Sequence, residues 1–341
     1  MMPPTFHETA HGSTPICDLG LTIAGSPLEP ILAEFQRELE AAGVRKVQPR
    51  FYLSTEWGVP EGTVAVAIPF YLARPDLTAL HADRAGYIEG SGHADILRYL
   101  RHEMGHVVNY AYRLFDSPEW ADTFGAFNEP YEEDYRPEPF SRRHVRHLPG
   151  WYAQKHPDED WAETFAVWVT PGLDWRSEYA DWPVALGKLQ YCDRTMASHI
   201  DVEPIVTADD LDEDVSCLPQ SLDALYHGLD LDGFASPAGF DGMLRSIFED
   251  VGRPEVAPIE TPRIPASDLL RRLEPELSMA VFRWTGCFPE RIRPLIRHLA
   301  QRADVLNQVY PIDRESSATI EITTMLTALA MNHVVRGTFL G

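Results

Sequence analysis

One run of residues, from about His93 to Phe115, constrains the fold of this chain more than any other part of the sequence. Its apolar residues recur at helical spacing and would form a single stripe: Ile96, Leu97, Leu100, Met104, Val107, Val108 and Ala111. In a folded domain a stripe of this kind faces the core. The sequence therefore predicts a long helix that packs against a domain core.

The same run contains His102-Glu103-Met104-Gly105-His106, an HExxH motif. Residues four apart share one face of a helix, so both imidazoles can bind one ion about 2.0 to 2.1 Å away. Glu103 then lies beside that ion, where it can accept a proton from a water whose pKa zinc lowers to about 7. Two ordinary histidines on a helix surface are the alternative interpretation of the motif.

A third ligand is expected further along the chain. The longer HExxHxxGxxH pattern is absent, because Asn109 and Tyr112 occupy its glycine and third-histidine positions. A predicted helix from Asp158 to Val169 instead offers Glu159 and Glu163, one turn apart. We expect Glu159 to complete a site for one Zn²⁺ ion, and Glu163 to accept the second ring N–H of a ligating histidine.

The two acids beside Glu159 have a different expected role. Asp158 and Asp160 stand in the first turn of the predicted helix, where the helix dipole favours negative side chains, and we expect both to be solvent-exposed. An acidic helix start in solvent is also the alternative interpretation of Glu159. Burial of one side of the helix by Trp161 and Phe165 favours the ligand instead.

These motifs resemble those of a known class of enzymes. HExxH followed about fifty residues later by ExxxE resembles the gluzincin zinc metallopeptidases, and more distantly the anthrax lethal factor-like peptidases. The segment Trp151–Val169 looks like a bacterial family of zinc-binding metallopeptidases whose members carry HPxEDWAETFA. The resemblance covers about residues 45 to 200. It implies a zincin-like fold and carries five site residues over by position: His102, Glu103, His106, Glu159 and Glu163.

An aromatic residue precedes the third ligand. Tyr152 stands seven residues before Glu159, where lethal factor-like peptidases have a tyrosine that faces the reacting carbonyl. The resemblance implies that its phenol donates a hydrogen bond to the oxyanion. A partly buried structural tyrosine is the alternative, and three histidines are rival donors: His144, His147 and His156.

Five further residues are candidates for substrate binding. The edge of a strand at Val64 and Val66 precedes the metal helix and could pair with a substrate backbone. Arg142 and Arg146, with His147 beside them, form a basic segment that could contact a substrate carboxylate. A purely structural strand and a solvated loop that pairs with nearby acids are the alternatives.

The fold class expected is α+β, in two domains. Residues 1–202 are predicted to form a zincin-like domain, in which strands Val47–Ser54 and Thr63–Pro69 contribute to a small mixed sheet packed on the metal-binding helix. Residues 203–341 are predicted to form a mainly helical domain with a Pro-rich linker near 253–265. Its three longest predicted helices are Ser267–Trp284, Pro289–Val309 and Ser316–Val335.

Charge and composition exclude several classes of partner. The chain has 52 acidic and 29 basic residues and a formal charge of −23, which repels nucleic acid and anionic membrane surfaces. No stretch approaches the roughly 20 apolar residues of a membrane span, and no secretory signal is recognisable, so we expect a cytoplasmic protein. The four cysteines form no CxxC pair, which argues against a cysteine zinc site.

These features together predict a zinc metallopeptidase with Glu103 as general base, acting on peptide bonds of a restricted protein or peptide substrate. Two alternatives stay open. The first is a zinc hydrolase of a small peptide-like or anionic metabolite, and the second is a catalytically silent protein that zinc stabilises. The presence of Glu103 argues against the second, because a structural zinc site needs no general base.

Overall fold

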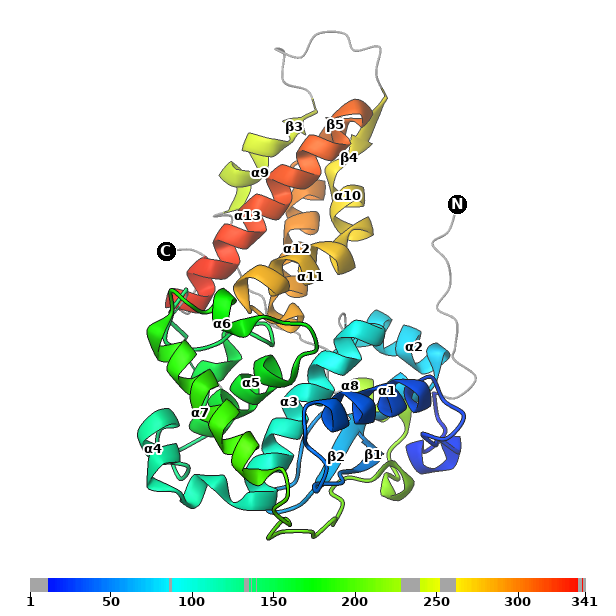
Figure 1. The fold of residues 1–341 in the computed structure, drawn as a ribbon. Helices are drawn as coiled ribbons and strands as arrows, with labels where there is room; N and C mark the ends of the chain where they lie inside the picture. The colour runs from blue at the N-terminus through cyan, green and yellow to red at the C-terminus, as the bar shows by residue number, and fades with distance from the viewer. Residues whose placement is uncertain are drawn as a thin grey trace. The chain divides into compact units, whose positions relative to one another are not determined.

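The computed structural model describes residues 12–85, 88–131, 135, 137–138, 140–227, 240–251, 262–336 and 339 (Figure 1). The chain forms two compact units. The first comprises Met1–Arg84 and Ile88–Asp230, and the second comprises Ala85–Tyr87 and Leu231–Gly341. Helices and small sheets occur in both, as expected for the α+β class.

The first unit extends beyond the domain boundary predicted at residue 202, because it continues to Asp230. Backbone hydrogen bonds hold the additional segment in place. The N–H groups of Ile205 and Val206 both donate to the carbonyl of Ala111, at 2.8 and 3.0 Å. This carbonyl lies in the last turn of a helix, where it has no partner within the helix, so residues 205 and 206 complete the hydrogen bonding at this helix end.

Helices make up most of the first unit. They are α1 (Leu28–Ala41), α2 (Pro75–Ala85), α3 (His93–Tyr112), α4 (Pro118–Phe124), α5 (Pro157–Val169), α6 (Trp175–Glu178), α7 (Pro183–His199) and α8 (Leu222–His227). The predicted helix that begins at His93 therefore forms, but it ends at Tyr112 rather than Phe115. Arg113 adopts a left-handed conformation with φ of 52°, which stops the helix there.

The sheet of the first unit is narrower than the mixed sheet that the sequence predicted. Strands β1 (Arg50–Ser54) and β2 (Ala65–Pro69) pair in parallel, with Arg50 opposite Ala65. Both strands are shorter than expected. Among the described residues of this unit, the only antiparallel pairing with these strands is a single bridge between Gly58 and Ala67. The segment around Gly58 thus lies along the edge of β2 that faces away from β1.

Helices α3 and α5 pack closely in the core of the first unit. Gly105 of α3 makes this possible, because a Cβ atom at this position would lie 2.6 Å from the Cα atom of Ala162 on α5. The indole N–H of Trp161, which is fully buried, donates to the Gly105 carbonyl at 2.8 Å. The two helices that were predicted to carry the metal ligands are therefore held in backbone contact.

The second unit is mainly helical but contains a sheet that the sequence did not predict. Its helices are α9 (Asp241–Ile247), α10 (Ala266–Arg272), α11 (Glu274–Thr285), α12 (Pro289–Val305) and α13 (Glu315–Arg336). Strands β3 (Glu249–Asp250), β5 (Gln308–Pro311) and β4 (Arg263–Pro265) form an antiparallel sheet in that order.

This sheet corrects two predictions for the second unit. Gln308 and Val309, expected at the end of a helix, belong to β5, since α12 ends at Val305. Arg263–Pro265, expected in the Pro-rich linker, form β4, and the linker residues 253–261 lie outside the described residues. No helix in the described part of the chain is both long and apolar enough to span a lipid bilayer.

Candidate metal centre

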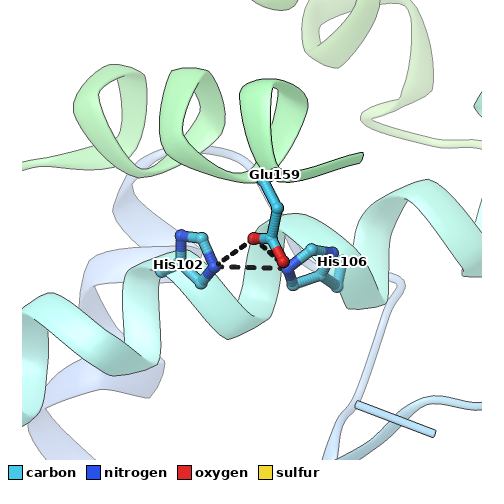
Figure 2. Close-up of side chains that lie close together, drawn as sticks. All are labelled: His102, His106 and Glu159. Carbon is cyan, nitrogen blue, oxygen red and sulfur yellow. Dashed lines mark hydrogen bonds and ion pairs between the residues drawn. The ribbon is translucent and has the colours of Figure 1, made fainter. Parts of the chain in front are cut away.

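Three side-chain atoms from α3 and α5 converge on one point (Figure 2). The Nε2 atoms of His102 and His106 are 3.2 Å apart. The Oε2 atom of Glu159 lies 3.0 Å from the first and 3.3 Å from the second. Donor atoms at about 2.0 to 2.1 Å from a tetrahedral ion are about 3.3 Å apart, so all three separations fit one zinc-sized cation.

The other nitrogen of each imidazole contacts a buried carboxylate. His102 Nδ1 lies 2.9 Å from Glu163 Oε1, and His106 Nδ1 lies 2.8 Å from an oxygen of Asp158. An ionised carboxylate only accepts hydrogen bonds, so each Nδ1 carries a hydrogen. When the ring is neutral, its Nε2 therefore has a lone pair that points to the common point. Glu159 Oε2, which is buried and without a hydrogen-bond donor, completes the set of three electron-pair donors.

Asp158 is buried rather than solvent-exposed as predicted, with an exposed fraction of 6%. Besides His106, it accepts hydrogen bonds from Asn109 Nδ2 at 2.6 Å and from the hydroxyl of Tyr110 at 2.7 Å. The N-terminus of α5 therefore faces α3 instead of solvent. A signal for this role is present in the sequence, since the partners at positions 106, 109 and 110 share one helix face.

Asp160 is also buried, contrary to the prediction, because it forms an ion pair with Lys188 of α7. Both residues are less than 10% exposed. A charge enters the protein interior at acceptable cost only when it is paired. This pair joins α5 to α7, and neither residue is among the three candidate ligands.

The electrostatic environment of the centre favours a cation. Burial alone would lower the pKa of His102, but the adjacent carboxylates of Glu159 and Glu163 outweigh it and raise this pKa to about 9. Burial also lowers the pKa of His106, but the nearby carboxylates of Asp158 and Glu159 outweigh this effect. The pKa of His106 is therefore raised well above its usual value. Without a metal ion, the centre therefore compensates its carboxylates by binding protons.

The metal centre opens into a cavity of about 460 Å³. Five acidic residues line it: Glu61, Glu103, Glu129, Asp158 and Glu159. Aromatic residues form much of the remaining wall: Trp57, Tyr110, Phe127, Tyr131 and Tyr152. No lysine or arginine is among the described residues that line the cavity, so its walls are strongly negative before any cation is bound.

The structure places Glu103 and Tyr152 at this cavity, where the sequence predicted catalytic groups. Burial raises the pKa of Glu103, as suits a general base that acts near neutral pH. The ring of Tyr152 lies 5.5 Å from that of His102. Tyr131, which the sequence analysis did not identify, donates a hydrogen bond from its hydroxyl to Glu159 Oε1 at 2.6 Å.

The structure does not bring Val64 and Val66 to the cavity. Both side chains are buried in the core, and the Val64 carbonyl accepts a hydrogen bond from the N–H of Arg50. Val66 is paired with Phe51 of β1. The strand edge that was predicted to bind substrate therefore pairs with β1 instead. The segment around Gly58 forms part of the cavity wall.

The basic segment and the histidines also have other roles than substrate contact. The guanidinium of Arg146 lies over the Trp182 ring at 5.1 Å, and Arg142 is exposed outside the cavity lining. His147 donates its backbone N–H to Glu163 at 3.0 Å, which positions that carboxylate. His156 lines the cavity, but its Nδ1 accepts from the backbone N–H of Asp158 and so caps α5.

Comparison with known proteins adds no relative to this description. No family model, no curated protein and no solved structure matches the chain. The chemical interpretation of the centre therefore rests on its own geometry.

Proposed function

We propose that this protein is a zinc-dependent hydrolase of peptide bonds, in which His102, His106 and Glu159 bind the ion and Glu103 is the general base. The convergence of three buried electron-pair donors, at 3.0 to 3.3 Å from one another, carries this proposal. A similar arrangement of two histidines and a glutamate is what the resemblance to gluzincins implies.

The donor set favours zinc over calcium and magnesium. Two imidazole nitrogens and one carboxylate oxygen are typical ligands of catalytic zinc, whereas calcium and magnesium prefer oxygen ligands. Three protein ligands leave a fourth position for water or substrate, which a structural zinc site does not have. The cavity beside the donors gives both water and substrate access to that position.

Each remaining residue of the centre has a role in amide hydrolysis. A bound Zn²⁺ ion supplies a Lewis acid that lowers the pKa of water to about 7 and polarises a carbonyl. Glu103 accepts the proton of the attacking water and passes it to the leaving nitrogen. Tyr152 donates a hydrogen bond to the carbonyl oxygen as negative charge develops there. Asp158 and Glu163 hold the two imidazoles in the ligating tautomer.

A peptide fits the cavity better than a small anionic metabolite does. Gly58 and Val59 line the cavity in a segment that runs beside β2, where an extended chain could lie along the backbone. The described lining residues include no cationic side chain to bind an anion.

Metal analysis of the purified protein, combined with cleavage-site profiling on a peptide library, tests the proposal. A protein without stoichiometric zinc, or one that cleaves no peptide, contradicts it.

The acidic cavity predicts a preference for basic peptides. Glu61 is exposed at the cavity, and its carboxylate makes no hydrogen bond or ion pair within the described chain. An opposite charge at about 4 Å contributes about 1 kcal/mol in water and more near a protein surface. Peptides with Lys or Arg beside the cleaved bond are therefore expected to have a kcat/KM about 10-fold above that of matched Asp or Glu peptides.

The variant Glu61→Gln tests the source of this preference. It is expected to reduce the ratio of the two kcat/KM values about fivefold, with little change for neutral peptides. Glu40→Gln is the matched control, since Glu40 is an exposed acid of α1 outside the cavity lining. Equal ratios in the wild type and in both variants contradict the prediction.

Zinc uptake is expected to release protons. In the metal-free protein the pKa of His102 is about 9 and that of His106 is raised well above its usual value. Both rings are therefore in the charged imidazolium form at pH 7. A ligating imidazole is neutral, so the apparent zinc affinity should increase as the pH rises from 6 to 9. Calorimetric titration in two buffers of different ionisation enthalpy measures the protons released. A binding heat that is independent of the buffer argues against this coupling.

A further inference from the structure

Tyr131 contacts the third metal-ligand residue directly. Its hydroxyl donates to Glu159 Oε1 at 2.6 Å, whereas Glu159 Oε2 faces His102 and His106. The two oxygens of this carboxylate therefore have separate partners. Glu159 is 4% exposed, and Tyr131 is the donor to Oε1 in the described part of the chain.

We propose that Tyr131 is a positioning residue that would keep Glu159 bound to the metal through Oε2 alone, and so would leave a position beside the water open for the substrate carbonyl. The inference rests on the proposed zinc site. The three ligand residues alone do not define how many donor atoms the protein supplies to the ion. The Tyr131 hydroxyl would define this number.

The strength of the hydrogen bond supports this role. Bonds from a hydroxyl to an ionised carboxylate are typically 2.5 to 2.7 Å long and about twice as strong as neutral ones. A carboxylate without such a donor can turn both oxygens to one cation. Zinc accepts a fifth ligand, so the second oxygen would fill the fifth position, which the substrate carbonyl needs beside the water. The Tyr131 hydroxyl opposes this rotation because it holds Oε1 away from the two histidines.

The same hydroxyl lies 3.4 Å from the hydroxyl of Tyr152. A phenol has one hydrogen to donate, and Tyr131 donates its hydrogen to Glu159. Tyr152 is therefore the donor in the contact between the two phenols. Tyr131 thus orients the ligand carboxylate, and the Tyr152 hydroxyl has to turn from Tyr131 to the carbonyl oxygen when negative charge develops there.

Ring contacts of Tyr131 are independent of its hydroxyl. Lys155 Nζ lies 4.3 Å from the centre of the Tyr131 ring, and the His156 ring lies 5.3 Å away. Phenylalanine keeps both kinds of contact. The variant Tyr131→Phe therefore removes the hydrogen bond to Glu159 with little effect on packing. Tyr135→Phe is a matched control, because the hydroxyl of Tyr135 donates to the carbonyl of Gly150 and, among the described residues, makes no hydrogen bond to a ligand residue.

The test uses the full-length protein loaded with Co²⁺, whose visible absorption is more intense in four-coordinate than in five-coordinate sites. The wild type and Tyr135→Phe are expected to give the same intense spectrum. Tyr131→Phe is expected to bind one ion per chain but with a weaker and shifted spectrum, and to lose about 10- to 100-fold in kcat/KM towards a cleaved peptide.

Each outcome distinguishes the inference from the function on which it rests. A Tyr131→Phe spectrum superimposable on that of the wild type overturns the role of Tyr131 and leaves the zinc site intact. A spectrum changed equally in Tyr135→Phe also overturns it, because the effect would then not depend on Glu159. A wild-type protein that binds no Co²⁺ or Zn²⁺ contradicts the proposed function itself.

Discussion

Replacement of Glu103 by Gln is expected to lower kcat for peptide cleavage about 10²- to 10⁴-fold while the protein keeps one zinc ion per chain. The amide has nearly the same size as the carboxylate but cannot accept the proton of water. Glu103 is not among the three residues whose donor atoms converge, so metal affinity should change little. Metal content by elemental analysis and steady-state kinetics on one peptide measure the two effects separately.

His106→Ala provides the contrasting variant. It removes one of the three converging donors and leaves Asp158 as a buried acid without its imidazole partner. We expect zinc content well below one ion per chain, together with loss of activity. Equal zinc retention in Glu103→Gln and His106→Ala would show that the ligand assignment is wrong. Zinc retention with unchanged turnover in Glu103→Gln would instead favour a different general base.

A second large effect is expected at Gly105, which no chemical step uses. In Gly105→Ala the new Cβ would lie 2.6 Å from the Cα atom of Ala162, so α3 and α5 must move apart by about 0.8 Å to reach an ordinary 3.4 Å contact. Overpacking of this kind costs about 1 to 3 kcal/mol, which lowers Tm by roughly 2 to 12 °C. Misplacement of about 1 Å can reduce activity about 100-fold.

Gly187→Ala is the control for the effect of alanine in a helix. Gly187 lies within α7, and a Cβ atom there would have no neighbour within 4 Å. This variant should be neutral or more stable by up to about 1 kcal/mol, because alanine favours the helix. Thermal unfolding and zinc affinity of both variants check the prediction. If Gly105→Ala matched Gly187→Ala in both measurements, the close packing of α3 and α5 would not position the ligands.

Local patterns in the sequence predicted the helices of the metal centre well. The spacing of apolar residues located α3, and the pattern around Glu159 located α5, because each helix shows its buried face in its own sequence. The four-residue spacing of His102 and His106 then followed from helix geometry. The convergence of Glu159 on these histidines depends on packing, for which the motif resemblance was the only guide.

Features that depend on contacts between distant segments were not predicted. Asp158 was expected in solvent because a helix dipole alone explains an acid at that position. Its partners share one face of α3, but that face does not indicate which acid packs against it. Tyr131 lies in an irregular segment without periodicity, so nothing in the sequence pointed to Glu159. The strands of the second unit are two to four residues long, too short for an alternating pattern to be recognised.

Helix α5 places four acidic side chains on four different partners. Asp158 and Glu163 each bond a histidine, Glu159 faces the proposed metal position, and Asp160 pairs with a lysine. Successive residues of a helix are rotated by about 100°. Loss or insertion of one residue between Asp158 and Glu163 would therefore redirect at least one of these acids away from its partner. A change in chain length that keeps all four contacts is therefore confined to the loops that flank α5.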